Sequence, residues 1–323
     1  MNRNAILIAS LLASGNAAAI TITASQDPNA LAGSLLANAN TGILVTSASL
    51  SGHAETLTFG GLTLSPLTSS GTYTNSTNTY GIGSGVVLST GGVEGAELQG
   101  TPVWPGYGDG DNTTEGNGYP FGTGFDVGGI PDPNDPPPGT PATAAQEGLL
   151  DPITGDPATQ TFYDHFDVTE LVINFDMQSG FDRVSFNIVF GSEEYPEFVE
   201  SPFIDGFGMF LNGVNIAQVG GKPVNIKHPD MTDTVTGTEL DGVLAPNGNP
   251  VLTFSGLANP TGNTLRFIVA DTSDGIYDTT VYFSALKGIN EVPLPAGVWL
   301  LGTGVAGLVG RRLLRGRAGA PST

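Results

Sequence analysis

The sequence predicts an all-β protein, a β-sandwich of jelly-roll-like form with a long surface loop rich in glycine and proline. The 323 residues include 47 Gly and 23 Pro but only 13% charged residues, a composition that favours strands and turns over helices. Short apolar runs bounded by turn residues also recur along the chain. Because sandwiches often reach about 200–250 residues, one large domain at residues 20–289 is expected.

The N-terminal segment, residues 1–19, has the features of a secretory signal peptide. A short positive region containing Arg3 precedes an apolar run at residues 5–13, and small residues follow at Ala17 and Ala19. This order is typical of a segment that is cleaved during export. We therefore expect the domain to lie outside the inner membrane.

Nine runs within the domain are predicted to be strands, since each is rich in β-branched or aromatic residues and ends at turn formers. Asn212-Gly213 lies between apolar segments and predicts a two-residue hairpin turn. One short helix is indicated at residues 31–38. The predicted strands are residues 42–50, 55–64, 85–90, 170–177, 183–190, 206–219, 251–257, 264–271 and 279–286.

The composition changes at residues 103–160, which are predicted to be an inserted surface-loop region. Residues 103–140 hold many Gly, Pro and Asp and few apolar side chains. Asp109, Asp111 and Glu115 offer oxygen ligands for a cation, but a solvated loop is the simpler interpretation. The loop is also a place where ligand specificity could reside.

The C-terminal segment, residues 290–323, is expected to form a hydrophobic tail outside the domain. Residues 296–310 carry no charge, and as a helix they would span roughly 22 Å, less than a hydrocarbon core of about 30 Å. Pro293 and Pro295 favour an extended hinge before this segment. Arg311 and Arg312 follow it and would stop transfer on the cytoplasmic side.

The order of motif, apolar segment and arginines resembles the PEP-CTERM class of sorting tail. The motif Val-Pro-Leu-Pro-Ala of one variant of this class is present as Val292, Pro293, Leu294, Pro295 and Ala296. The resemblance implies recognition by a membrane-embedded exosortase, removal of the tail, and delivery to the cell surface or the extracellular matrix. Before that processing, residues 296–310 would anchor the chain in the membrane.

The charge distribution excludes one class of partner. Residues 20–289 hold five of the ten basic residues and all but one of the 31 acidic residues. Such a surface repels a phosphate backbone, so nucleic-acid binding is not expected. There is no cysteine, which excludes disulfides, thiol catalysis and thiolate metal sites.

The domain as a whole resembles the choice-of-anchor L family of exported bacterial modules, over most of residues 26–289. The most characteristic segment is 186–215, although Ile204 replaces a residue that is usually polar, and the loop at 103–140 is longer than expected. The resemblance implies export and anchoring and no established catalytic activity. The matching segments are residues 31–52, 81–93, 162–177, 184–226 and 266–286.

Two acidic turns stand out in a chain with so few charges. GSEEYPEF follows the predicted strand 183–190, and ADTSDGIYDTT joins the last two predicted strands. Clustered carboxylates repel one another unless they are protonated, hydrogen-bonded or bridged by a cation, and Ca²⁺ accepts six to eight oxygen ligands from irregular loops. We hypothesise that the two turns meet at one end of the sandwich and share Ca²⁺; in the alternative interpretation these side chains cap backbone amides and face water. The candidate ligands are Glu193, Glu194, Asp205, Asp271, Asp274 and Asp278.

These observations favour a structural or adhesive protein without enzymatic activity, with exopolysaccharide or a neighbouring surface protein as its partner. The alternative is a secreted glycan-active hydrolase, in which Glu193 or Glu194 would act with an aspartate from residues 271–278. No serine elbow or metalloprotease motif accompanies the histidines.

Overall fold

The computed structural model describes most of the domain. The predicted signal peptide, the loop at residues 103–139 and the sorting tail lie outside the described residues. Within the described part, no helix is both long enough and apolar enough to cross a bilayer. The described residues are 20–36, 41–55, 58–59, 62–63, 67–93, 140–156, 158–196, 198–233, 240, 242–275 and 278–290.

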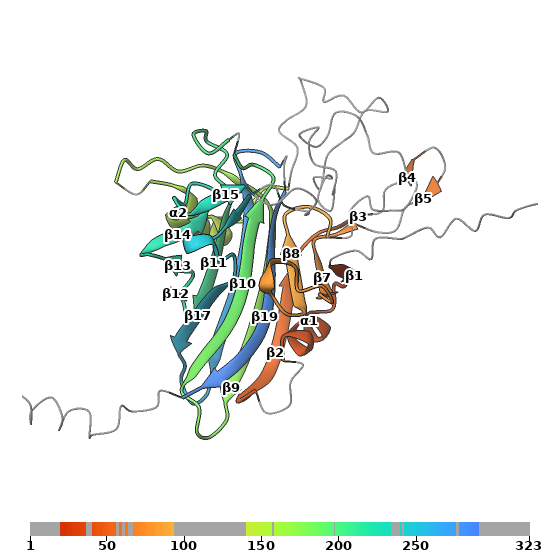
Figure 1. The fold of residues 1–323 in the computed structure, drawn as a ribbon, viewed down its shortest axis with the longest axis vertical. Helices are drawn as coiled ribbons and strands as arrows, with labels where there is room; N and C mark the ends of the chain where they lie inside the picture. The colour runs from red at the N-terminus through yellow and green to blue at the C-terminus, as the bar shows by residue number, and fades with distance from the viewer. Residues whose placement is uncertain are drawn as a thin grey trace, which may run out of the picture.

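Two antiparallel sheets packed face to face form the fold, which confirms the predicted β-sandwich (Figure 1). The first sheet has the order β1-β7-β8-β19-β10-β16-β15, and β17 also pairs with β10. Its strands are β1 (Thr21–Ala24), β7 (Ser70–Thr74), β8 (Gly85–Ser89), β10 (Arg183–Ser192), β15 (Met231–Asp233), β16 (Gly242–Leu244), β17 (Leu252–Leu257) and β19 (Thr279–Ile289).

The second sheet has the order β13-β14-β11-β18-β9-β2, and β12 pairs with β11. Asn212 and Gly213 make the tight turn between β11 and β12 with positive φ angles of 51° and 83°, as the hairpin prediction requires. The strands are β2 (Ile43–Ser51), β9 (His165–Met177), β11 (Gly206–Leu211), β12 (Val214–Asn215), β13 (Gln218–Val219), β14 (Lys222–Asn225) and β18 (Asn263–Thr272).

The core lies between the two sheets and contains inward side chains of the long strands β9, β10, β18 and β19, together with residues of β8, β11 and α1. Along β9, buried and half-buried residues alternate from Leu171 onwards, because successive side chains of a strand point to opposite faces. Aromatic rings make contacts across the interface: the ring centroids of Phe267 and Phe283 are 4.7 Å apart, and those of Phe207 and Phe283 are 5.5 Å apart. These contacts fix the sheets relative to each other.

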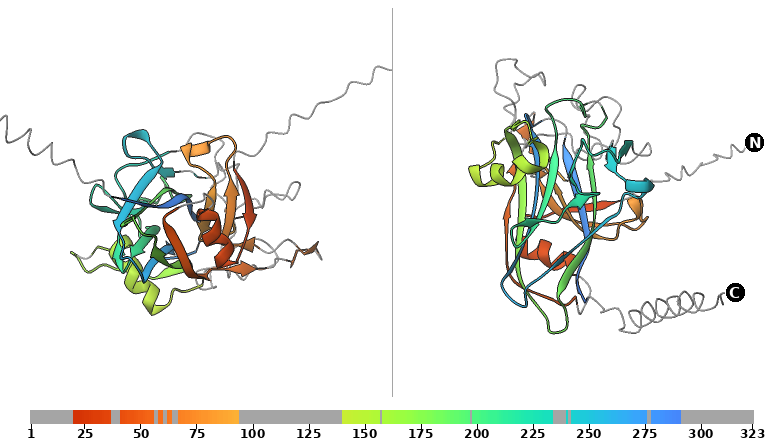
Figure 2. Two further views of the ribbon diagram at one scale, coloured as in Figure 1. Left: turned by 90° about the horizontal axis from the view of Figure 1, so that it is seen from below. Right: turned by 90° about the vertical axis from the view of Figure 1, so that its left-hand side faces the viewer.

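Helix α1 (Pro28–Leu35) closes one side of the sandwich, between β2 of one sheet and β8 of the other (Figure 2). Its first turn is capped by Asp27, whose carboxylate accepts a hydrogen bond from Asn29 N at 2.9 Å. Leu31 and Leu35 are buried in the core. This helix agrees with the one predicted at residues 31–38.

A second helix, α2 (Ala144–Thr154), corrects the prediction that residues 103–160 are all surface loop. The helix starts at a capping box in which Thr143 and Gln146 bond reciprocally to each other's backbone amides. Leu150 and Ile153 then pack on the outer face of the second sheet, against residues such as Phe210. The Pro and Gly residues around this amphipathic segment led to the prediction of a loop in place of the helix.

The prediction of nine strands was too low, since several short strands were missed. Strands β1, β7, β14, β15 and β16 were not predicted, because they are three to five residues long and lack a clear apolar alternation. The run at 55–64 is divided among short ribbons instead of forming one strand. The remaining elements are β3 (Ala54–Glu55), β4 (Thr58–Phe59), β5 (Leu62–Thr63), β6 (Leu67–Thr68), η1 (Thr79–Gly81) and η2 (Pro246–Gly248).

Candidate metal centre

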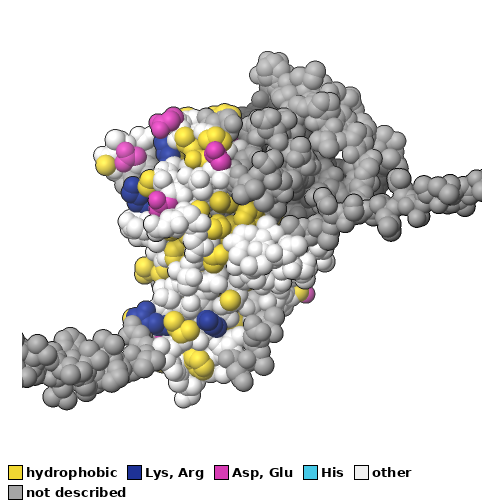
Figure 3. Space-filling model, in the orientation of Figure 1, with side chains coloured by type: hydrophobic (Ala, Val, Ile, Leu, Met, Phe, Trp, Pro, Cys, Tyr) yellow, Lys and Arg dark blue, Asp and Glu magenta, His cyan; other side chains and the backbone are white. Residues whose placement is uncertain are grey.

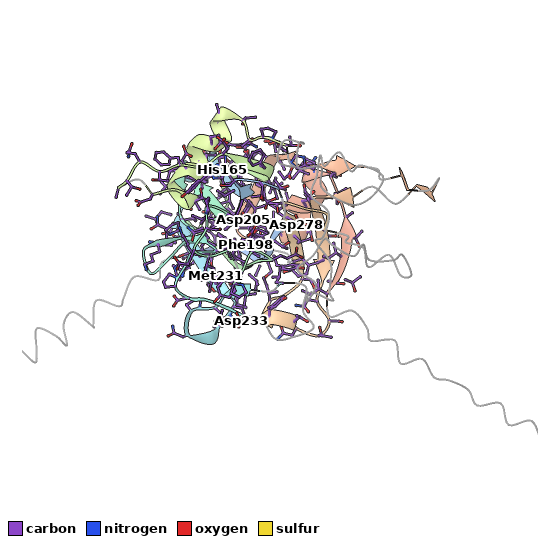
Figure 4. The ribbon with its side chains drawn as sticks, turned by 90° about the horizontal axis from the view of Figure 1, so that it is seen from above. His165, Phe198, Asp205, Met231, Asp233 and Asp278 are labelled. Carbon is purple, nitrogen blue, oxygen red and sulfur yellow. The ribbon has the colours of Figure 1, made fainter. Side chains whose placement is uncertain are left out.

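The two acidic turns meet at one end of the sandwich. Strands β10 and β19 pair up to Ser192 and Thr279, so the residues just beyond them are held together. The Glu193 amide donates a hydrogen bond to the Asp278 carbonyl at 3.1 Å. Figure 4 looks down on this end and shows Asp205 and Asp278 beside each other near its centre.

Asp205 connects both sides of this end. One carboxylate oxygen accepts a hydrogen bond from the Thr272 amide at 2.9 Å, and the other accepts one from the Thr279 hydroxyl at 2.7 Å. Thr272 ends β18 in the second sheet and Thr279 begins β19 in the first. Asp205 therefore ties the two sheets together while remaining only 1% exposed.

Asp271 and Asp278 are also 1% exposed, but they differ from Asp205 in their bonding. Among the described residues, neither oxygen of either carboxylate has a hydrogen-bond partner. Thr90 and Asp205 are close enough to Asp271 to influence its pKa, yet neither meets hydrogen-bond geometry with it in the structure. Burying a carboxylate without a donor is costly, so two such groups call for an explanation.

Asp167 is a further member of this group that the sequence did not reveal. It lies in β9, is completely buried, and has a positive φ of 47°. One of its carboxylate oxygens accepts a hydrogen bond from Thr140 N at 2.7 Å. Its charge acts on both Asp271 and Asp278. We call Asp167, Glu193, Asp205, Asp271 and Asp278 the acid cluster.

Burial and mutual repulsion disfavour charge on these carboxyl groups. Burial raises the pKa of Asp205 to about 7, with a smaller contribution from Asp274, while hydrogen bonds from Thr279 and Thr272 oppose the rise. Burial, followed by neighbouring carboxylates, raises the pKa of Asp271 and Asp278 well above the ordinary value. No ion pair is found for these three residues in the described part of the chain.

The other predicted ligands lie at the same end. Glu193 and Glu194 are 5% and 2% exposed, which is unusual for glutamates in a turn. Asp274 is half-buried and close enough to Asp205 to raise its pKa. The structure thus brings Glu193, Asp205, Asp271, Asp274 and Asp278 together and buries Glu194 in the adjoining turn.

The surface reflects this inward placement of acidic groups. In the described part of the face shown in Figure 3, only scattered Asp and Glu side chains are visible, although the chain is strongly acidic. Gly91 closes the cluster on one side, because a Cβ there would lie 1.6 Å from Asp278 Oδ2. Backbone therefore packs directly against that carboxylate.

The ligand atoms of the acid cluster are more widely spaced than those of the group formed by Glu147, Asp151 and His165. In the described part of the chain, only Glu147, Asp151 and His165 bring three ligand atoms within 4.8 Å of one another. An ion in the acid cluster would therefore have to draw the carboxylates inwards. Calcium tolerates this best, since its coordination is flexible and its bonds to oxygen are long, about 2.3–2.6 Å.

Comparison with known protein families gives a match. A family model described as the choice-of-anchor L domain matches residues 133–249, a shorter range than the expected 26–289. The match contains α2 and the turn at Glu193 and Glu194, whereas Asp271, Asp274 and Asp278 lie beyond it.

Searches of the curated proteins and of the solved structures find no match. The choice-of-anchor L domain points to a non-catalytic protein without excluding an enzymatic activity. Residues 133–249 therefore contain a choice-of-anchor L domain, which indicates a secreted, surface-associated protein.

Proposed function

We propose that this protein is an exosortase-sorted component of the cell surface or extracellular matrix, with a structural or adhesive sandwich that calcium stabilises. The observation that carries the calcium proposal is the pair Asp271 and Asp278, which are buried beside further carboxylates and have no hydrogen-bond partner among the described residues. The sequence features at both ends of the chain support export and sorting. Exopolysaccharide or a neighbouring surface protein is the proposed partner.

An ion would explain why these carboxylates are buried together. Protonation relieves their repulsion near or below the raised pKa values, but a divalent cation does so at neutral pH with the carboxylates charged. The side-chain ligands of the acid cluster are all carboxylate oxygens, which suit Ca²⁺ better than Zn²⁺. Mg²⁺ is smaller and demands a nearly ideal octahedron, which a wide cluster from irregular turns does not favour.

The position of the cluster suits a stabilising role. Two members lie in β9 and β18 of one sheet, and the others directly follow β10, directly precede β19 and directly precede β11. A shared ion would cross-link strands distant in sequence and would bind only the folded chain. Extracellular calcium modules commonly bind with dissociation constants of about 0.1–1 mM, which fits an exported protein.

The hydrolase alternative rests on a different interpretation of the same carboxylates. A carboxyl group with a pKa near 7, such as Asp205, is typical of a general acid. However, the carboxylates of Glu193 and Glu194 are almost completely buried, whereas a glycosidase must present its pair to a sugar. In this alternative, Glu193→Gln would remove glycan turnover and leave the fold intact; under the calcium proposal no turnover exists to be lost.

Thermal unfolding of the purified full chain tests the calcium proposal. We expect the unfolding midpoint to fall when calcium is replaced by excess chelator and to recover when calcium, but not magnesium, is added back. Asp233→Asn is a matched control, since Asp233 is exposed and lies in β15, which β16 separates from β10 in the first sheet. A midpoint unaffected by chelator would refute the proposal.

A further inference from the structure

We propose that Glu147, Asp151 and His165 form a second metal site, which takes one divalent transition-metal ion such as Zn²⁺. Each of these residues offers a ligand atom, and the three atoms lie within 4.8 Å of one another. The site contains an imidazole nitrogen, unlike the acid cluster, and so selects a different class of cation.

The fold places these three residues by simple local rules. Glu147 and Asp151 are one turn apart on α2, so both side chains project from the same face of the helix. His165 begins β9, and its carbonyl accepts a hydrogen bond from Ala142 N at 2.8 Å, just before the helix starts. This bond holds the start of β9 beneath α2, and Figure 4 shows His165 there.

His165 is held in an orientation suited to a metal ligand. The ring is completely buried, and its Nε2 lies 2.7 Å from the Thr154 hydroxyl. That hydroxyl is within 3.4 Å of the Leu150 carbonyl, to which it can donate. An Nε2–H donated to Thr154 leaves the Nδ1 lone pair facing Glu147, and metal-binding histidines usually have such a partner at the second nitrogen.

Glu147 is held in the same way. Its Oε1 accepts a hydrogen bond from the His165 amide at 3.1 Å, while Oε2 lies against Nδ1 of the same residue. One oxygen therefore fixes the carboxylate, and the other faces the proposed ion. The Glu147 side chain is 27% exposed, which gives an ion a path from solvent.

The position of Asp151 is not explained by a role in capping or pairing within the described part of the fold. Its side chain makes no hydrogen bond or ion pair with any described residue. It also lies in the last turn of α2, where the helix dipole disfavours negative charge. A cation held between Asp151, Glu147 and His165 would offset the unfavourable interaction of Asp151 with the helix dipole.

The ligand set indicates which ion is favoured. One nitrogen and two carboxylate oxygens suit Zn²⁺, with bonds of about 2.0–2.2 Å, and leave a coordination position for water. Ligands of a tetrahedral Zn²⁺ are about 3.4 Å apart, so Glu147 and His165 would separate slightly from hydrogen-bond contact. The half-exposed rim of the site permits this movement more readily than the buried acid cluster would.

Titration of the full chain with Zn²⁺ by calorimetry, in the presence of saturating Ca²⁺, tests the proposal. We expect one site per chain that is lost, or weakened at least about tenfold, in Asp151→Asn. Metal-free Asp151→Asn is expected to unfold at the wild-type midpoint or above it, because the substitution removes a charge from the last turn of α2.

Two controls separate this site from others. His228 and Asp230 also pair, at 3.8 Å, but no second carboxylate of a described residue completes a group with them, so Asp230→Asn should retain the zinc site. Asp278→Asn alters the acid cluster and should also retain it. Co²⁺ should give a visible absorption band in the wild-type chain and none in Asp151→Asn. Equal Zn²⁺ affinity in the wild-type chain and Asp151→Asn, or loss of zinc binding in Asp278→Asn alone, would overturn the proposal.

Discussion

Asp278→Asn should have opposite effects on stability with and without calcium. Asp278 is buried, has no hydrogen-bond donor in the described part of the chain, and lies near Glu193, Asp167 and Asp205. Asparagine has almost the same shape, so it fits against Gly91, and its amide group can donate to neighbouring carboxylates. Without an ion, the substitution removes a carboxyl group whose ionisation is disfavoured by burial and by its neighbours; with calcium, it removes a charged ligand.

The size of the effect follows from binding linkage. Calcium at a hundredfold excess over its dissociation constant stabilises the native state by about 2.7 kcal/mol. For a domain of roughly 150–250 residues, 1 kcal/mol shifts the midpoint by about 2–4 °C, so the wild-type chain should gain about 5–11 °C. Asp278→Asn should gain little, and in chelator it should match or exceed the wild-type midpoint.

Differential scanning calorimetry of both full chains at pH 7.5, in calcium and in chelator, measures the four midpoints. If Asp278 only caps local structure, the variant will be less stable than wild type under both conditions. The same calcium shift in both chains, or a variant that is weaker than wild type in chelator, would refute our reasoning.

Three further predictions concern the pH dependence, the packing around the cluster and the tail. In chelator, the midpoint should fall from pH 5 to pH 8, because Asp205, Asp271 and Asp278 have raised pKa values in the folded state. The native state then binds more protons than the unfolded state, and this stabilisation is lost as the pH rises through the native pKa, about 7 for Asp205. Unfolding scans at three pH values check this fall in the midpoint, and calcium should abolish it. Gly91→Ala should lose the calcium shift and about 1–3 kcal/mol of stability, since the new Cβ would overlap Asp278. The control Gly148→Ala on α2, with open space around it, should be neutral or stabilising in the same denaturation assay. Deletion of Val292 to Ala296 should leave the chain with the cell membrane instead of the surface or matrix, as cell fractionation would show, and normal surface delivery of the deleted chain would contradict the sorting hypothesis.

The sandwich could be predicted because its central strands are long. Strands β9, β10, β18 and β19 have ten residues or more, which makes their apolar patterns visible above the background of polar residues. The short outer strands could not be found in this way. Their positions depend on pairing between distant segments, such as β1 with β7, and not on a pattern of their own.

Helix α2 was missed although a signal was present. Thr143 and Gln146 have the spacing of a capping box, and apolar residues follow at Leu149, Leu150 and Ile153. The composition of the preceding loop dominated the interpretation of the whole region. The group of Glu147, Asp151 and His165 was missed for the same reason, because its spacing has meaning only on a helix.

Part of the acid cluster could be predicted from the sequence. Glu193 and Asp278 lie in turns that follow and precede apolar strands, so their meeting could be expected if those strands paired. Asp167 could not be placed, because the strand was predicted to start at Glu170 and the residue adopts an unusual positive φ. The close packing of Gly91 depends on contacts between segments almost 190 residues apart.

The most direct measurement for the central claim is calcium binding to the calcium-free full chain by isothermal titration calorimetry. The acid cluster predicts saturable binding of one Ca²⁺ per chain, with a dissociation constant of about 1 mM or lower, and loss of that binding in Asp278→Asn. Absence of saturable binding up to about ten times that concentration, or unchanged binding in Asp278→Asn, would contradict a calcium site at the acid cluster.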